Sequence, residues 1–230
     1  MKRLVSVLLL CTAVAVPVQA NLTVHPMRTS VEVRKGAQIR VYSQSPQPQY
    51  VQLRLRRIID PAGDNEREVE VDPAEAAIAI TPARFALAGA GNRLIRVVPL
   101  QPVDEEQAYR IYVEGVRGPE AGSAEDGAGA AAQVGVSLVW GALVNVLPAA
   151  GEVQLQLHGG VLANTGTLRV GLTTVAECDG ARCTAHDVSR SLYPGSHLPL
   201  PFVPVPGRSL QVRYQLTGDG HREHLQTLSP

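Results

Sequence analysis

The residue types that carry out catalysis form no recognisable site in this chain of 230 residues. His186, Asp187 and Ser189 lie close together, but a catalytic triad needs side chains that converge from separate elements, and no GxSxG turn is present. Glu105 and Glu106 form a carboxylate pair, but neighbours in a strand point to opposite faces. HExxH, P-loop and dinucleotide-binding motifs are also absent from the sequence. We therefore expect no catalytic residues, no enzyme activity and no cofactor.

The arginines are better candidates for a binding role. Arg54 and Arg56 alternate with Leu53 and Leu55, which is typical of the solvated outer face of a strand. Arg28 lies in the segment HPMRTSVEV, near the N-terminus. It is either a surface residue or a side chain that binds an anion through two hydrogen bonds.

The N-terminus predicts export. The sequence MKRLVSVLLLCTAVAVPVQA has a short basic region, an apolar run and a small-residue cleavage pattern, so residues 1–20 are expected to be a secretory signal peptide. Lipidation at Cys11 is disfavoured, because Leu10 stands where a small residue is required. No later stretch is long and apolar enough to cross a bilayer. Outside residues 1–20 the chain has 19 basic and 21 acidic residues, which gives a net charge of 19 − 21 = −2. The chain therefore has no overall positive charge that would attract nucleic acid.

Two cysteines remain in the exported chain, Cys178 and Cys183. An even number of cysteines in an oxidising compartment predicts a disulfide bond. A metal site would need more ligands than these two and His186, so no metal is expected.

The elements that would position these residues are β-strands. Short runs with period-two alternation, rich in Val, Ile, Leu and Tyr, are bounded by Gly, Pro, Asn or Asp throughout the chain. About seven precede residue 148 and about six follow it, and only residues 72–80 suggest a short helix. The pattern predicts an all-β protein with two immunoglobulin-like β-sandwich domains, at 21–148 and 149–230.

The segment AAQVGVSLVWGALVNVLP, residues 131–148, is a long strand with one apolar face. Its even positions are all apolar, whereas Gln133, Gly135 and Ser137 are small or polar. The preceding residues 118–130, GPEAGSAEDGAGA, are typical of a flexible loop. The second half of the strand suits an ordinary core strand, and the first half suits pairing with another protein.

Together these stretches resemble the PapD-like family of periplasmic pilus chaperones, and in particular its alternate, CS1-type branch. The resemblance covers essentially all of the exported chain. It depends on the order and spacing of several segments rather than on one motif: PMRTSVEVRKG, IRVYSQSPQPQYVQLRLRRIIDP, ITPARFALAGAGNRLIRV, EEQAYRIYVEGV, LANTGTLRVGL, the cysteine pair and SLYPGSHLPLP.

The resemblance implies two immunoglobulin-like domains set as a boomerang. It also implies a chaperone that lends a β-strand to fimbrial subunits and delivers them to an outer-membrane usher, which is β-augmentation. By this resemblance the donor residues that enter the subunit groove are Val134, Val136, Leu138 and Trp140. Trp140 is alternatively an ordinary core residue.

The resemblance also assigns a carboxylate anchor. Arg28 matches the arginine that holds the C-terminal carboxylate of the subunit. The family's second anchor is a lysine, but Leu143 occupies its position here, and Arg110 on the preceding strand is the nearest replacement. Glu106 matches a glutamate that ties the two domains together, although Leu147 stands where its usual arginine partner would be.

The expected location is the periplasm, and the expected partners are pilin subunits and the usher. An exported adhesin or pilus structural subunit is the alternative, but such a subunit would carry its own N-terminal donor extension. Exposed apolar strands tend to pair, so self-association of the unloaded protein is a further hypothesis.

Overall fold

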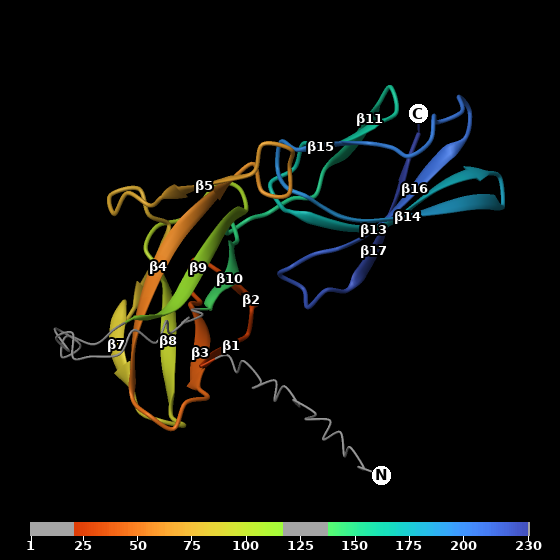
Figure 1. Ribbon diagram of the computed structural model, residues 1–230. Helices are drawn as coiled ribbons and strands as arrows, with labels where there is room; N and C mark the ends of the chain where they lie inside the picture. The colour runs from red at the N-terminus through yellow and green to blue at the C-terminus, as the bar shows by residue number, and fades with distance from the viewer. Residues whose placement is uncertain (1–20, 117–137, 230) are drawn as a thin grey trace, which may run out of the picture.

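The computed structural model describes residues 21–116 and 138–229, and within these ranges every regular element is a β-strand (Figure 1). Over the same residues no helix is long and apolar enough to cross a membrane. The predicted signal peptide, the predicted loop at 118–130 and the donor residues Val134 and Val136 lie outside the described residues.

Within residues 21–116 and 138–148, the first domain has ten strands in two sheets. One sheet has the order β1-β3-β8-β6, and the other has the order β2-β10-β9-β4-β5, with β7 paired to β4. The strands are β1 (Leu22–His25), β2 (Arg28–Val31), β3 (Ala37–Ser43), β4 (Gln49–Ile59), β5 (Arg67–Glu70), β6 (Ile78–Thr81), β7 (Arg84–Leu87), β8 (Asn92–Pro99), β9 (Gln107–Val116) and β10 (Val139–Val146).

The two sheets enclose one apolar core. Ile39 and Ile95 come from the first sheet and Ile111 and Val144 from the second, and all four are almost completely buried. Alternation along each strand produces this core, because successive side chains point to opposite faces. The chain changes sheet early, since β1 pairs with β3 in one sheet whereas β2 pairs with β10 in the other. Arg28 is thereby placed beside β10.

The described residues of the second domain, 149–229, form seven strands around a separate core of residues such as Leu162, Val175, Leu210 and Val212. Its sheets have the orders β11-β12-β15 and β14-β13-β16-β17. The strands are β11 (Leu155–His158), β12 (Val161–Asn164), β13 (Val170–Asp179), β14 (Arg182–Leu192), β15 (His197–Pro199), β16 (Ser209–Gln215) and β17 (Glu223–Leu228). Cys178 and Cys183 face each other across the β13–β14 hairpin and form the predicted disulfide bond.

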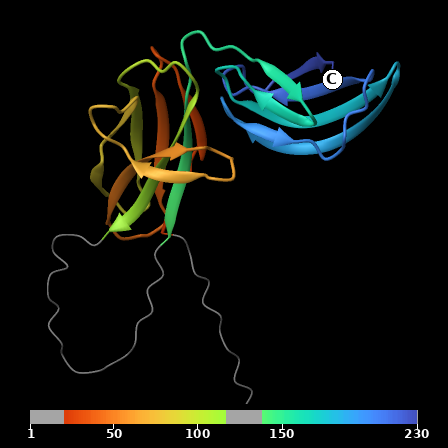
Figure 2. The ribbon, with the colours of Figure 1, turned by 90° about the horizontal axis from the view of Figure 1, so that it is seen from above.

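The two sandwiches lie at an angle to each other, and the segment after β10 connects them (Figures 1 and 2). The predicted all-β fold of two immunoglobulin-like domains in a boomerang arrangement is confirmed. We propose that the domain boundary falls at residue 148, between the end of β10 and the start of β11.

The prediction of a short helix at 72–80 is wrong. Residues 73–75 form a turn, in which the Ala74 amide donates a hydrogen bond of 2.9 Å to the Asp72 carboxylate. Strand β6 then begins at Ile78 and pairs with β8 in the register Ile80↔Val97. Pairing with a buried neighbouring strand outweighs the helix propensity of the alanines and glutamate in this segment.

Candidate functional site

Among the strands that the structure describes, none pairs with the outer edge of β10 over its first half, and this stretch is called the open edge of β10. It pairs with β9 along its whole length, from Val139 to Val146, but with β2 only from Leu143 onward. The Leu143 amide donates a hydrogen bond of 2.9 Å to the Met27 carbonyl. Because backbone groups alternate in direction along a strand, those of Gly141 and Val139 point to the same side. No strand that the structure describes pairs with them there.

The side chains of β10 divide between two faces. Ala142 and Val144 are completely buried in the first core, and Trp140 is half-buried against it. The indole Nε1 of Trp140 is buried and has no hydrogen-bond acceptor among the described residues. Leu138 and Val139 are 47% and 45% exposed. Of the predicted donor residues within the described range, Leu138 is thus available to a partner, whereas Trp140 already packs against the core.

Two arginines flank Leu143 in one row across the second sheet. Leu143 pairs with Arg28 of β2 on one side and with Arg110 of β9 on the other. Residues in register share a face, and two strand spacings separate the two arginine Cα atoms by about 10 Å. The structure therefore brings together the two arginines that the sequence analysis named as anchors.

Leu143 itself belongs to the contact between the domains. It packs against a small buried cluster formed by Ile58 and Ala108 of the first domain and Tyr193 of the second. At this position a lysine would place a charge in an apolar cluster, which is unfavourable without a partner. The apolar side chain of Leu143 therefore suits its position in the contact between the two domains.

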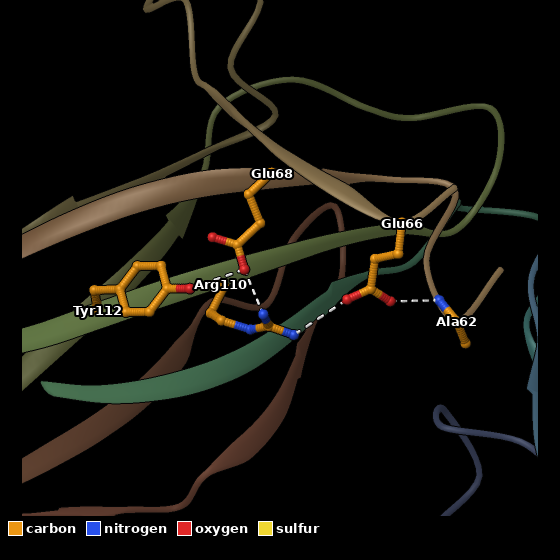
Figure 3. A network of polar contacts seen from close by, with 5 residues as sticks. All are labelled: Ala62, Glu66, Glu68, Arg110 and Tyr112. Atoms are coloured by element: carbon orange, nitrogen blue, oxygen red, sulfur yellow. Dashed lines mark hydrogen bonds and ion pairs between the residues drawn. The ribbon is translucent and has the colours of Figure 1, made fainter. Parts of the chain in front are cut away.

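Arg110 is held by two carboxylates from the segment of β5 (Figure 3). Its Nη1 donates a hydrogen bond to Glu68, and its Nη2 lies 3.7 Å from Glu66. The hydroxyl of Tyr112 donates to the same Glu68 oxygen at 2.9 Å. Burial alone would lower the pKa of Arg110, but its hydrogen bond with Tyr112 and the charges of Glu68 and Glu66 raise the pKa above its usual value. Arg110 therefore stays charged.

Glu106 links the domains through a buried polar network. Its carboxylate accepts hydrogen bonds from the Asn145 side chain at 2.7 Å, the Arg169 backbone amide at 2.9 Å and the Thr217 hydroxyl at 3.3 Å. The Asn145 amide also donates to the Tyr193 hydroxyl at 2.9 Å. Burial raises the pKa of Glu106, an effect that these hydrogen bonds and the nearby Arg169 charge partly offset.

Sequence reasoning did not find the partners of Glu106. The resemblance places an arginine partner at the position of Leu147, whereas Arg169 of the second domain supplies both a backbone donor and a positive charge. The Arg169 guanidinium lies 5.9 Å from the centre of the Tyr193 ring. One signal was available in the sequence, since Asn145 is a lone polar residue within an otherwise apolar run.

The other candidate residues are placed separately. His186, Asp187 and Ser189 lie along β14, where the ring of His186 stacks on Phe202 at 4.5 Å between centroids. Glu105 is exposed while its neighbour Glu106 is buried, so the two carboxylates do not face each other. Arg54 and Arg56 are in ion pairs with Glu114 at 2.8 Å and Glu70 at 3.0 Å, respectively, on the outer face.

Comparison with known proteins identifies fimbrial relatives, although no family model matches the chain. The chain is 25% identical over 188 residues to an Escherichia coli protein named as a CS1 fimbrial subunit, covering 77% of this chain and 79% of that protein. The crystal structure of the class 5 fimbriae chaperone CfaA superposes with a TM-score of 0.78 at 20% identity, covering 91% of this chain and 100% of that one.

A solved chaperone–tip adhesin complex from CFA/I fimbriae biogenesis gives a TM-score of 0.76 at 20% identity, covering 92% and 100% of the two chains. The resemblance predicted from the sequence is confirmed: the chain has the two-domain fold of the fimbrial chaperones.

Proposed function

We propose that the protein is a periplasmic chaperone that binds fimbrial subunits and delivers them to an outer-membrane usher. The observation that carries this proposal is the open edge of β10 beside Val139 and Gly141, in a chain with the fold of fimbrial chaperones. An extended strand of a partner can add to such an edge by main-chain hydrogen bonds, with alternate side chains giving specificity.

The donated strand would comprise Val134, Val136 and Leu138, which enter an apolar groove of the subunit. Leu138 supports this role because its side chain is exposed immediately before β10. Trp140 would close the end of the groove next to the first core. Main-chain hydrogen bonds would supply the affinity for the subunit. The proposed role therefore consists of binding and releasing a subunit, and it includes no catalytic step.

Arg28 and Arg110 would bind the C-terminal carboxylate of the subunit. Both lie in the row through Leu143, on the face that is turned toward the second domain. Guanidinium groups recognise carboxylates through paired hydrogen bonds. Two such groups about 10 Å apart at their Cα atoms can converge on one carboxylate, because each side chain is long and flexible.

The alternative of an adhesin or pilus structural subunit is not favoured. Although the curated relative is named as a fimbrial subunit, the superposed proteins include a chaperone on its own and a chaperone in complex with a tip adhesin. We further propose that the N-terminal 20 residues direct export to the periplasm and are removed there.

The proposal is tested by affinity capture from the periplasm with identification of captured proteins by mass spectrometry. The wild-type protein should capture a fimbrial subunit, and Leu138→Glu should lose it, because a charge would enter an apolar groove. Leu100→Glu is the matched control, since Leu100 is also exposed (55%) but follows β8, which belongs to the sheet that does not contain β10. Equal capture by both variants would disprove strand donation at Leu138.

A further inference from the structure

The two arginines of the proposed anchor differ in what they contact. Arg28 is exposed, and within the described residues no carboxylate lies within salt-bridge distance of it. Arg110, in contrast, already contacts Glu68 and Glu66. A carboxylate that arrives at this row would meet one arginine that is available and one that is occupied.

Glu68 is the principal occupant of Arg110. One of its oxygens accepts from both the Arg110 guanidinium and the Tyr112 hydroxyl (Figure 3). Glu66 is more distant from the guanidinium, and its other oxygen accepts a hydrogen bond of 2.7 Å from the Ala62 amide. Glu66 is thus held by its own loop, whereas the contacts of Glu68 are to β9.

The stem of Arg110 lies over Gly141. A Cβ atom at Gly141 would come within 3.0 Å of Arg110 Cδ and 3.4 Å of Cγ, so the missing side chain leaves the space that the stem occupies. Gly141 belongs to the part of β10 with the open edge. The side chain of Arg110 is still 31% exposed and that of Glu68 is 22% exposed, so the pair is accessible to a ligand.

We infer that Glu68 is an internal competitor for the carboxylate that Arg110 binds, so that a subunit must displace Glu68 from Arg110 when it docks. This inference rests on the proposed function. The carboxylate of the subunit would contact Arg28 first and then exchange with Glu68 at Arg110. The displaced Glu68 stays nearby and repels the incoming carboxylate.

The exchange makes this anchor reversible. One carboxylate–guanidinium contact is lost for each one gained, so Arg110 adds less to the affinity than an unoccupied arginine would. When the subunit leaves, Glu68 replaces its carboxylate and no charge is left unpaired. Release to the next acceptor is therefore faster than it would be without Glu68.

The test measures how fast a preformed complex releases its subunit. The probe is the complex with the fimbrial subunit that the wild-type protein captures. An excess of a synthetic peptide of residues 131–146 is added to this complex. The peptide competes for the groove of the subunit but lacks both arginines. Glu68→Gln should slow release by about two- to fivefold, the range for a charged pair that is partly screened by solvent. Glu70→Gln is the matched control, because Glu70 is on the same strand but pairs with Arg56.

The variants separate the inference from the proposed function. Arg110→Ala should speed release, and adding Glu68→Gln to it should change the rate by less than about twofold, because the contact for which Glu68 competes is gone. If Glu68→Gln speeds release like Arg110→Ala, Glu68 positions the arginine and the inference is wrong. The inference is also wrong if the Glu68→Gln and Glu70→Gln variants release the subunit at equal rates. If the protein captures no subunit, or if Arg28→Ala and Arg110→Ala both behave as wild type, the proposed anchor itself fails.

Discussion

Replacing Glu106 with alanine should weaken the coupling between the two domains and lower the free energy of unfolding. The change removes the acceptor of three hydrogen bonds that join Asn145 of the first domain to Arg169 and Thr217 of the second. Glu105→Ala is the control, because it removes the same side chain from an exposed neighbouring position.

Loss of the hydrogen bond to Glu106 has a different free-energy cost for each of the three donors. The Arg169 amide is buried and keeps no other partner in the network, so its loss costs about 1–3 kcal/mol. Asn145 keeps its hydrogen bond to Tyr193, and Thr217 keeps the one that it accepts from Arg169 Nη1, so each of these contributes about 1 kcal/mol. Removal of a buried carboxylate offsets part of the loss, which leaves a net destabilisation of about 3 kcal/mol.

Denaturant unfolding followed by two probes measures this effect. Trp140, the single tryptophan, reports on the first domain, while circular dichroism reports on both. Glu106→Ala should lower the unfolding midpoint and separate the two transitions, because the domains lose their shared contact. The reasoning is refuted if Glu106→Ala and Glu105→Ala differ by less than about 0.5 kcal/mol, the usual range of surface substitutions.

The contribution of Glu106 should also depend on pH. Burial raises its pKa above the ordinary value of 4.5, so the folded protein binds a proton that the unfolded chain releases. The free energy of unfolding of the wild type should exceed that of Glu106→Ala by the largest amount below pH 4.5, and this difference should fall as the pH rises through the pKa of Glu106 in the folded protein. A difference that grows with pH would contradict this prediction. Replacing Cys178 and Cys183 with serine should lower the free energy of unfolding by about 2 kcal/mol, as expected for a short closed loop. An unchanged urea midpoint in the double variant would argue against that contribution.

Local patterns in the sequence predicted the fold class and the disulfide well. Alternating apolar residues predicted most strands, because alternation directly sets which face is buried. The pattern underestimated the strand number at residues 67–87, where β5, β6 and β7 are each four residues long. Such short strands are stabilised by neighbours distant in the sequence, and their own residues contain little signal.

The site could be predicted only in part. The family resemblance suggested Arg28 and Arg110 as anchors, which stays a prediction, and the structure places both in one row through Leu143. The partners of Arg110 and Glu106 were missed, because Glu68 is 42 residues from Arg110 and Arg169 is 63 residues from Glu106. Contacts of this range depend on how sheets and domains pack, and no local pattern encodes them.

Amide hydrogen exchange along β10 tests strand donation most directly. In the unloaded protein the amides of Val139 and Gly141 face the open edge and should exchange rapidly, while those of Trp140 and Ala142 face β9 and should be protected. In the complex with the captured fimbrial subunit, Val139 and Gly141 should become protected by about a hundredfold or more, because each would donate to the added strand. If their exchange is unchanged in the complex, the subunit does not add to this edge and the account is wrong.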